Sequence, residues 1–255
     1  MAKPIYPRPE RKGNREPEIA LRSDLAAACR WAARLNLHEG ICNHFTVLLA
    51  RSPARVLINP KGRHFAKMTA SSLIAIDEEG RTVEGEGRAP VSGVAIHVPI
   101  HLRHPSAKVV LHCHMPYATA LTAIKGGRLE MVHQNSARFF GKLAYDDHFN
   151  GIALAQDEGR RMAAVMGEKR ILFLANHGVI VVAPTVAEAF DDLYYLERAC
   201  QVQLLAMQTG QPLNVMTDEM VRRTAAEFGD FAVNAELHFD ALRAALDEEE
   251  PAYAS

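Results

Sequence analysis

Three histidines are the residues of this chain best suited to chemistry. His112 and His114 are two positions apart in the segment VVLHCHMP, whose β-branched residues predict a strand. In a strand, residues i and i+2 point to the same face, so the two imidazoles should project together. Pro116 follows and ends the strand, which places the pair at a sheet end, where the sites of α/β proteins gather.

The third histidine, His177, interrupts the apolar segment FLANHGVIVV. An Asn-His pair inside an apolar strand costs free energy unless its polar groups find partners, and Gly178 would allow a close backbone approach. Three neutral imidazoles with an open fourth position form a common catalytic zinc arrangement, which manganese, iron or cobalt would also accept. The spacing does not show that the three histidines meet, and hydrogen-bonded strand histidines are the alternative interpretation of the HxH pair.

The elements that must position these histidines follow from hydrophobic periodicity. Apolar residues at spacings of three and four predict a helix from Leu21 to Leu35, stopped near Gly40. The segment 170–183 predicts one or two strands kinked at His177. Alternation of strands and helices favours a single α/β domain with a mixed sheet covered by helices. Further helices are expected at 94–104, 117–125, 157–166, 186–208 and 217–246, and further strands at 45–50, 55–60, 73–77 and 109–114.

The two ends of the chain differ in composition from its centre. Residues 1–18 are rich in proline and basic side chains, so they should form a flexible N-terminal arm or a segment that wraps a neighbouring subunit. The domain itself is expected to cover 19–246. The acidic tail, 247–255, is expected to be disordered.

Composition excludes several classes of function. The chain has 255 residues, of which 48% are apolar and 23% charged, as in ordinary globular domains. A net charge of −1 lacks the basic excess of a nucleic-acid surface. No apolar run reaches about 18 residues, so no membrane span is expected, and the basic N-terminus lacks the apolar core of a secretory signal. Four scattered cysteines without a CxxC pair predict free thiols in the reducing cytoplasm.

The order of these features resembles the class II aldolase/adducin family. The resemblance covers roughly residues 20–210 and is carried by the segments ICNHFTV, LINPKGRHFAKMTASSLIAID, GRAPVSGVAIHVPIHLRHPSAKVVLHCHMPYATAL and FLANHGVIVVAPTVAEAF. It implies a three-layer α/β/α fold around a central mixed, largely antiparallel sheet, and a homotetramer with sites at subunit interfaces. It also implies one divalent metal per subunit, usually zinc, on His112, His114 and His177.

The same resemblance implies a pocket for a small anionic molecule. The segments of that pocket match Asn43, Lys61, Gly62 and Ser92 in this chain. Asn43 and Ser92 could donate side-chain hydrogen bonds and Gly62 its backbone N–H, while a cation at Lys61 suits a carboxylate at least as well as a phosphate. A surface lysine in a turn and a plain helix N-cap are the alternative interpretations of Lys61 and Ser92.

Two positions depart from the pattern of the family's aldolases. Those enzymes carry a proton-shuttling glutamate at the position of Gly93, and a tyrosine from a neighbouring subunit at the position of Gln134. Glycine can be neither base nor ligand, and the loss of a positioned acid or base forfeits about 10²–10⁴-fold in rate. His97, one helical turn from Gly93, is the nearest replacement, and His101 is a weaker one. A buried histidine with satisfied nitrogens is the alternative interpretation of His97.

These observations together predict a divalent-metal-dependent carbon–carbon lyase that acts on a small hydroxy or oxo acid or a related carbonyl compound. A decarboxylase fits the missing glutamate better than an aldolase does, because decarboxylation needs no base to start. Gly93 also resembles the adducin branch of the family, whose head domains are structural. The alternative function is therefore a non-catalytic, oligomeric binding or scaffold protein.

Overall fold

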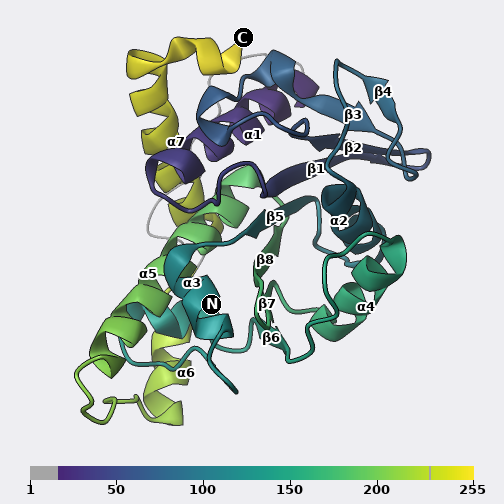
Figure 1. Cartoon of the computed structure of the whole chain (residues 1–255). Helices are drawn as coiled ribbons and strands as arrows, with labels where there is room; N and C mark the ends of the chain where they lie inside the picture. Colours follow the sequence, from purple (N-terminus) through teal and green to yellow (C-terminus); the bar gives the residue numbers. More distant parts are fainter. Residues whose placement is uncertain (1–16, 230) are drawn as a thin grey trace.

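A mixed sheet of eight strands runs through the centre of the molecule in a computed structural model that describes residues 17–229 and 231–255 (Figure 1). The strand order is β4 (Thr82–Glu84), β3 (Ile74–Ile76), β2 (Ala54–Ile58), β1 (His44–Arg51), β5 (Val109–Cys113), β8 (Gly178–Ala183), β7 (Ile171–Leu174) and β6 (Leu143–Asp146). β6 and β7 run parallel, and every other neighbouring pair is antiparallel. The expected mixed, largely antiparallel sheet is confirmed.

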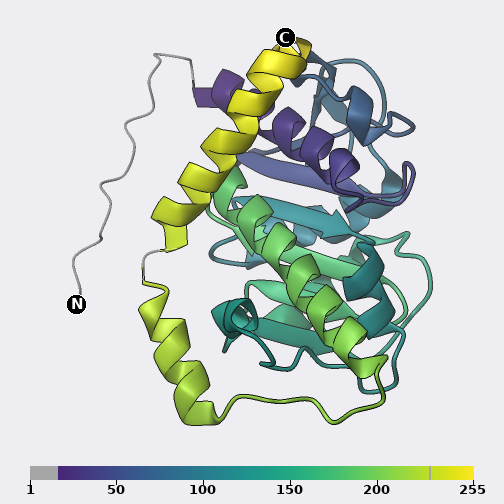
Figure 2. The ribbon, with the colours of Figure 1, turned by 90° about the vertical axis from the view of Figure 1, so that its left-hand side faces the viewer.

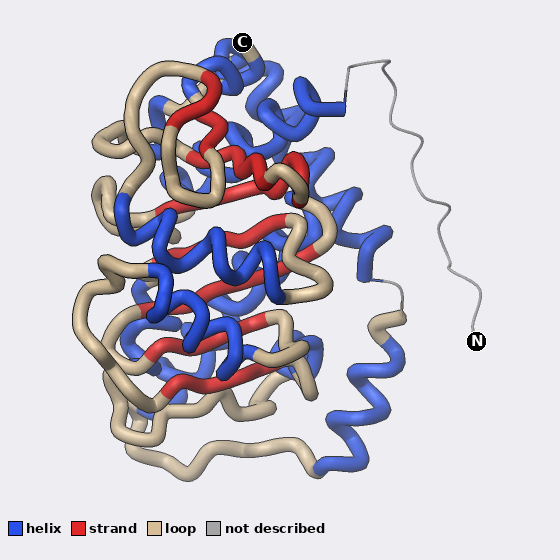
Figure 3. The backbone as a smooth tube through the Cα atoms, turned by 90° about the vertical axis from the view of Figure 1, so that its right-hand side faces the viewer, coloured by secondary structure: helices blue, strands red, loops and turns tan. Residues whose placement is uncertain are grey.

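Helices cover both faces of this sheet. On one face, α2 (Val91–Arg103) and α4 (Gln156–Met166) lie side by side over the strands (Figure 3). On the other face, the strands are covered by α1 (Pro17–Arg34), α3 (Pro116–Thr122), α5 (Val186–Met207) and α7 (Phe231–Glu249) (Figure 2). The expected three layers are therefore confirmed. The other helix is α6 (Asp218–Glu227), and 3-10 turns lie at Phe65–Lys67, Ala70–Ser72, Gln134–Phe139 and Pro251–Ala254.

Side-chain alternation along β5 separates the two cores. Leu111 and Cys113 belong to the apolar cluster under α1 and α5, whereas Val110 belongs to the cluster under α2 and α4. His112 alternates with Cys113 and therefore points toward the α2 side. β5 lies between β1 and β8, so His112 emerges from the middle of the sheet and is only 1% exposed.

The segment expected as one or two strands at 170–183 is a hairpin. β7 and β8 pair antiparallel, from Leu174 opposite Gly178 to Ile171 opposite Val181. His177 lies in the tight turn between them, where its N–H donates to the carbonyl of Leu174 at 3.1 Å. The kink expected at this histidine is therefore a chain reversal.

Two expectations about the C-terminal part are wrong. The helix expected at 217–246 is divided into α6 and α7, because Gly229 adopts a φ of +62° after α6 and ends that helix as a left-handed glycine commonly does. The tail expected to be disordered is ordered, since α7 continues to Glu249 and Tyr253 is 2% exposed.

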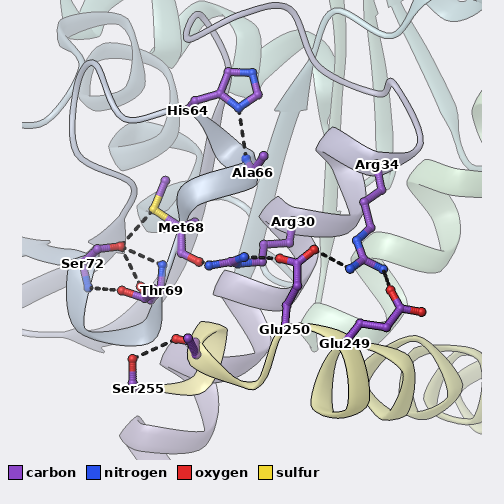
Figure 4. A network of polar contacts seen from close by, with 11 residues as sticks. Arg30, Arg34, His64, Ala66, Met68, Thr69, Ser72, Glu249, Glu250 and Ser255 are labelled. Carbon is purple, nitrogen blue, oxygen red and sulfur yellow. Dashed lines mark hydrogen bonds and ion pairs between the residues drawn. The ribbon is translucent and has the colours of Figure 1, made fainter.

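Arginines of α1 hold this tail in place (Figure 4). Arg30 and Arg34 both form ion pairs with Glu250, and Arg34 also meets Glu249 at 2.7 Å. The backbone carbonyl of Ser255 accepts a hydrogen bond from the N–H of Ser71 at 2.8 Å. The acidic composition alone suggested that the tail is exposed to solvent. The arginines that pair with its glutamates lie more than 200 residues earlier in the chain, so the tail's own sequence does not reveal them.

The expected N-terminal arm, 1–18, lies outside the described residues, apart from its last two positions, which begin α1. Within the described ranges, no helix combines the length and the apolar character that crossing a membrane requires. The four cysteines are free thiols, and all but Cys42 are buried.

Candidate metal centre

The structure brings the three predicted histidines together. His112, His114 and His177 each offer one ring nitrogen that could bind a metal ion, and these three atoms lie within 4.8 Å of one another. The ring centroids are separated by 4.7 to 4.9 Å. Among the described residues this is the only group of three or more histidine, cysteine or acidic side chains with such convergence.

Local backbone geometry explains the convergence. His112 lies in β5 and His114 directly after it, while the β7–β8 turn carries His177 to the same sheet end. Asn176 adopts a φ of +57° in that turn, and its N–H donates to the carbonyl of Thr122 at 3.1 Å. A Cβ on Gly178 would lie 2.6 Å from the carbonyl oxygen of Cys113, so the close approach of these two strands requires glycine.

Hydrogen bonds at the Nδ1 atoms determine the orientation of two of the three rings, those of His112 and His114. Nδ1 of His112 lies 3.0 Å from the carbonyl oxygen of Val179, and Nδ1 of His114 lies 2.7 Å from a carboxylate oxygen of Glu39. Both partners are acceptors, so both Nδ1 atoms carry the hydrogen and both Nε2 atoms present lone pairs. Such outer partners commonly orient metal-binding histidines.

The inner nitrogens fit a bound cation. Nε2 of His112 and Nε2 of His114 are only 3.1 Å apart, and two lone pairs at this separation repel unless a positive charge lies between them. Burial lowers the pKa of His177 to about 4, with a contribution from His114, and lowers the pKa of His112 well below its ordinary value. His112 and His177 are therefore neutral near pH 7, which is the form that binds metal.

Two of the four predicted anion-binding residues lie beside this cluster. Asn43 is 1% exposed, and its Oδ1 accepts the N–H of Glu39 at 2.6 Å. Its Nδ2 is buried and has no hydrogen-bond partner among the described residues, although burial of an unpaired amide donor costs about 1–3 kcal/mol. Ser92 lies in the first turn of α2, with Oγ 3.0 Å from Nε2 of His44.

The other two predicted anion-binding residues lie on an exposed turn after β2. The N–H of Lys61 donates to the carbonyl of Arg88 at 2.8 Å, and Gly62 adopts a φ of +85°. Within the part of the chain that the structure describes, no hydrogen bond or ion pair joins Lys61 to the histidines. Their contribution to an anion site stays a prediction.

His97, predicted as the replacement acid or base, is buried below the cluster. It has no exposed surface, and its Nδ1 and Nε2 bond to Oγ1 of Thr46 at 2.7 Å and to Nδ1 of His44 at 3.0 Å. Both ring nitrogens are therefore engaged. A direct contact between His97 and a substrate would require these bonds to break.

Sequence reasoning missed two residues of the site. His44 begins β1 opposite His112, and its ring stacks on that of His112 with centroids 5.0 Å apart. A Cβ on Gly93 would lie 3.2 Å from Cγ of His44, so the absence of a side chain at position 93 leaves room for this imidazole. The polar pair Asn43-His44 at the start of an apolar strand was a usable signal. Glu39 offered none, because it contacts a residue 75 positions away.

Comparison with known proteins identifies the family that most of the chain resembles. The model of the family described as "Class II Aldolase and Adducin N-terminal domain" matches residues 23–204. A "Putative aldolase class 2 protein" of Caulobacter vibrioides is 33% identical over 246 residues, which are 94% of this chain and 93% of the relative. "Decarboxylase NovR" of Streptomyces niveus is 32% identical over 206 residues, 80% of this chain and 76% of the relative.

Solved structures agree with these relatives. An aldolase II superfamily protein from Pseudomonas syringae has a TM-score of 0.86 and 30% identity, and covers 95% of this chain and 98% of that one. An L-fuculose 1-phosphate aldolase from Glaciozyma antarctica has a TM-score of 0.82 and 26% identity, and covers 96% of both chains.

Proposed function

The chain belongs to the class II aldolase and adducin family, and from this premise we propose that it is a divalent-metal-dependent carbon–carbon lyase. The observation that carries the proposal is the convergence of His112, His114 and His177, whose ring nitrogens lie within 4.8 Å of one another. Zinc is the metal that three imidazoles with an open position suit best, and manganese, iron and cobalt are the other candidates. The substrate is a small hydroxy or oxo acid or a related carbonyl compound.

Decarboxylation is the lyase reaction that suits this chain best. When bound, a divalent cation supplies a Lewis acid that polarises a substrate carbonyl or hydroxyl oxygen. In a substrate whose carbonyl adjoins the carbon that bears the carboxylate, the carbon–carbon bond to the carboxylate breaks and carbon dioxide leaves. The electron pair stays on the carbon next to the carbonyl until a proton from solvent is added there. No base has to remove a proton first, so Gly93 is compatible with this reaction. The name of the decarboxylase relative supports the same choice.

The residues around the cluster have separate tasks in this proposal. Nδ2 of Asn43 offers a donor for a carboxylate oxygen, and the backbone N–H groups at the start of α2 favour negative charge nearby. Glu39 and the carbonyl of Val179 keep His114 and His112 oriented. The ring centroids of Phe149 and His177 are 6.5 Å apart, so Phe149 would form an apolar side of the substrate site.

A homotetramer forms part of the proposal. Three apolar side chains on the loop between β6 and α4 are exposed: Phe149 by 53%, Ile152 by 79% and Leu154 by 68%. Neighbouring exposed apolar residues of this kind mark interaction sites. Because Phe149 adjoins His177, a subunit packed on this loop would also border the metal centre.

The second candidate function is a non-catalytic scaffold like the adducin heads. Gly93 supports it, since the position that carries the proton-shuttling glutamate of the aldolases has no side chain. The intact set of three converging histidines supports the lyase instead, because a scaffold that binds no metal has no need of it.

Elemental analysis of the purified protein tests the proposal. We expect about one divalent metal per chain, which is lost in His112→Ala and retained in His238→Ala, a control on α7 whose ring bonds to Asp191 at 2.8 Å. Protein loaded with that metal should release carbon dioxide from hydroxy or oxo acids. An intact protein that takes up neither added zinc nor manganese would contradict the lyase and favour the scaffold.

A further inference from the structure

A chain of polar side chains is buried between α2 and β1, next to the metal centre. His44 is 1% exposed, and Thr46, His97 and His101 have no exposed surface. Buried polar groups of this kind persist in proteins only when they are hydrogen-bonded. Hydrogen bonds link these residues in the order His101, Thr46, His97 and His44, and the chain ends at Ser92.

The direction of the hydrogen bonds is determined at the end remote from the metal centre. Nδ1 of His101 lies 2.7 Å from the carbonyl oxygen of Ala107, which can only accept. Burial lowers the pKa of His101 to about 4, so the ring is neutral near pH 7 and carries one hydrogen. That hydrogen must be on Nδ1, which leaves Nε2 of His101 as an acceptor.

Each following bond then has a single possible direction. Oγ1 of Thr46, 2.8 Å from Nε2 of His101, has one hydrogen and must donate it there, in preference to the more distant carbonyl of Val110 at 3.2 Å. Oγ1 of Thr46 therefore accepts from Nδ1 of His97 at 2.7 Å. Nε2 of His97 in turn accepts from Nδ1 of His44 at 3.0 Å.

The last bond reaches the substrate side. Nε2 of His44 is left as an acceptor, so Oγ of Ser92, at 3.0 Å, donates its only hydrogen to it. Ser92 is partly exposed, and its remaining capacity toward the site is two lone pairs. Ser92 is therefore an acceptor toward the site, whereas the sequence suggested that it would be a donor.

We propose that this buried chain holds Ser92 as a hydrogen-bond acceptor, so that the site selects a substrate with a hydroxyl group beside its carboxylate, such as a 2-hydroxy-3-oxo acid, over a phosphate monoester. A phosphate dianion offers only acceptors and would meet the lone pairs of Ser92. A hydroxy acid offers a donor for Ser92 and carboxylate oxygens for the free Nδ2 of Asn43. The substrate preference rests on the proposed function, whereas the direction of the chain does not.

Nitrogen-15 NMR of the histidine rings tests the direction of the chain in metal-free protein at pH 7.5. We expect His44, His97 and His101 all to carry hydrogen on Nδ1 and not on Nε2. Detection of hydrogen on Nε2 of His44 would overturn the proposal, whatever the protein catalyses. Thr46→Val removes the linking hydroxyl and should release the tautomers of His97 and His44, whereas Thr46→Ser should preserve them. If the valine variant does not fold, the wild-type tautomers still decide.

Binding of small anions to zinc-loaded protein tests the substrate preference. Glycolate should bind roughly tenfold more tightly than methoxyacetate, which lacks the hydroxyl hydrogen, and Ser92→Ala should reduce that ratio several-fold. The variant corrects for any difference in how the two ligands contact zinc. A ratio unchanged in Ser92→Ala, absence of glycolate binding, or tighter binding of methyl phosphate that depends on Ser92 would each overturn the preference. Loss of zinc binding in the wild type would instead contradict the proposed function, and the tautomers would remain measurable.

Discussion

The carboxylate of Glu39 lies 2.7 Å from Nδ1 of His114, although its side chain is 69% exposed. A carboxylate in this position holds the ring and makes its other nitrogen a better ligand. Glu39→Ala should therefore weaken metal binding roughly tenfold, the lower end of the usual range, because solvent can replace an exposed partner. Glu39→Gln, which keeps an acceptor oxygen, should have a smaller effect.

Competition with a chromophoric chelator measures this change directly. Glu86→Gln, at an exposed position on the loop after β4, is the matched control and should leave the affinity unchanged. Equal affinities of Glu39→Ala and the wild type would show that His114 does not depend on Glu39 for its orientation.

At the scale of elements, the close packing of α4 against α2 depends on Gly159. A Cβ on Gly159 would lie 2.0 Å from the carbonyl oxygen of Ala95, which is backbone of α2 and cannot turn aside. Gly159→Ala should therefore lower the free energy of unfolding by about 1–3 kcal/mol, even though alanine favours helix. Urea unfolding measures this, with Val165→Ala, at a 39% exposed position of the same helix, as the control. An unchanged or higher stability would mean that the helices can separate without cost.

The docking of the C-terminal tail on α1 should depend on pH. Hydrogen bonds from Arg34 and then from Arg30 lower the pKa of Glu250 below its ordinary value of 4.5. A carboxylate with a lowered pKa in the folded state stabilises that state above the unfolded pKa, and the effect is lost as pH falls through the folded pKa. The tail should therefore loosen below about pH 4.5 and remain docked at pH 7.

Hydrogen exchange of the amides near Tyr253, at pH 7 and pH 4, measures the docking of the tail. Glu250→Gln should expose these amides at both pH values, whereas the wild type exposes them only in acid. Protection in the variant equal to that of the wild type at pH 7 would assign the docking to Tyr253 and the apolar contacts instead.

At the scale of the whole molecule, the exposed apolar loop between β6 and α4 predicts assembly. Light scattering should report a mass of four chains for the wild type, and Ile152→Glu should reduce it, because a buried unpaired carboxylate opposes association. Val83→Glu, a change at a 53% exposed residue of β4, should leave the tetramer intact. A monomeric wild type, or a tetrameric Ile152→Glu, would remove this loop from the interface.

The sequence by itself predicted the three candidate metal-binding histidines and determined the class of fold that holds them. Period-two alternation places His112 and Val110 on one face of β5, and the polar Asn-His-Gly interruption marks the turn between β7 and β8. Both signals are local, because side-chain direction in a strand repeats every two residues regardless of the rest of the fold. The resemblance to the family and most of the strands and helices follow from such local signals repeated along the chain, whereas the short strands β4 and β6 and the division of α6 from α7 were not predicted.

The tertiary structure alone decided the partners of these residues. Glu39 reaches His114 across 75 positions, His44 reaches His97 across 53, and Arg30 reaches Glu250 across 220. Nothing local specifies such pairs, because they depend on which strands adjoin in the sheet and which helix covers them. The acceptor role of Ser92 is of the same kind, since it follows from a carbonyl at Ala107 and passes through residues of β1 and α2 before it reaches the site.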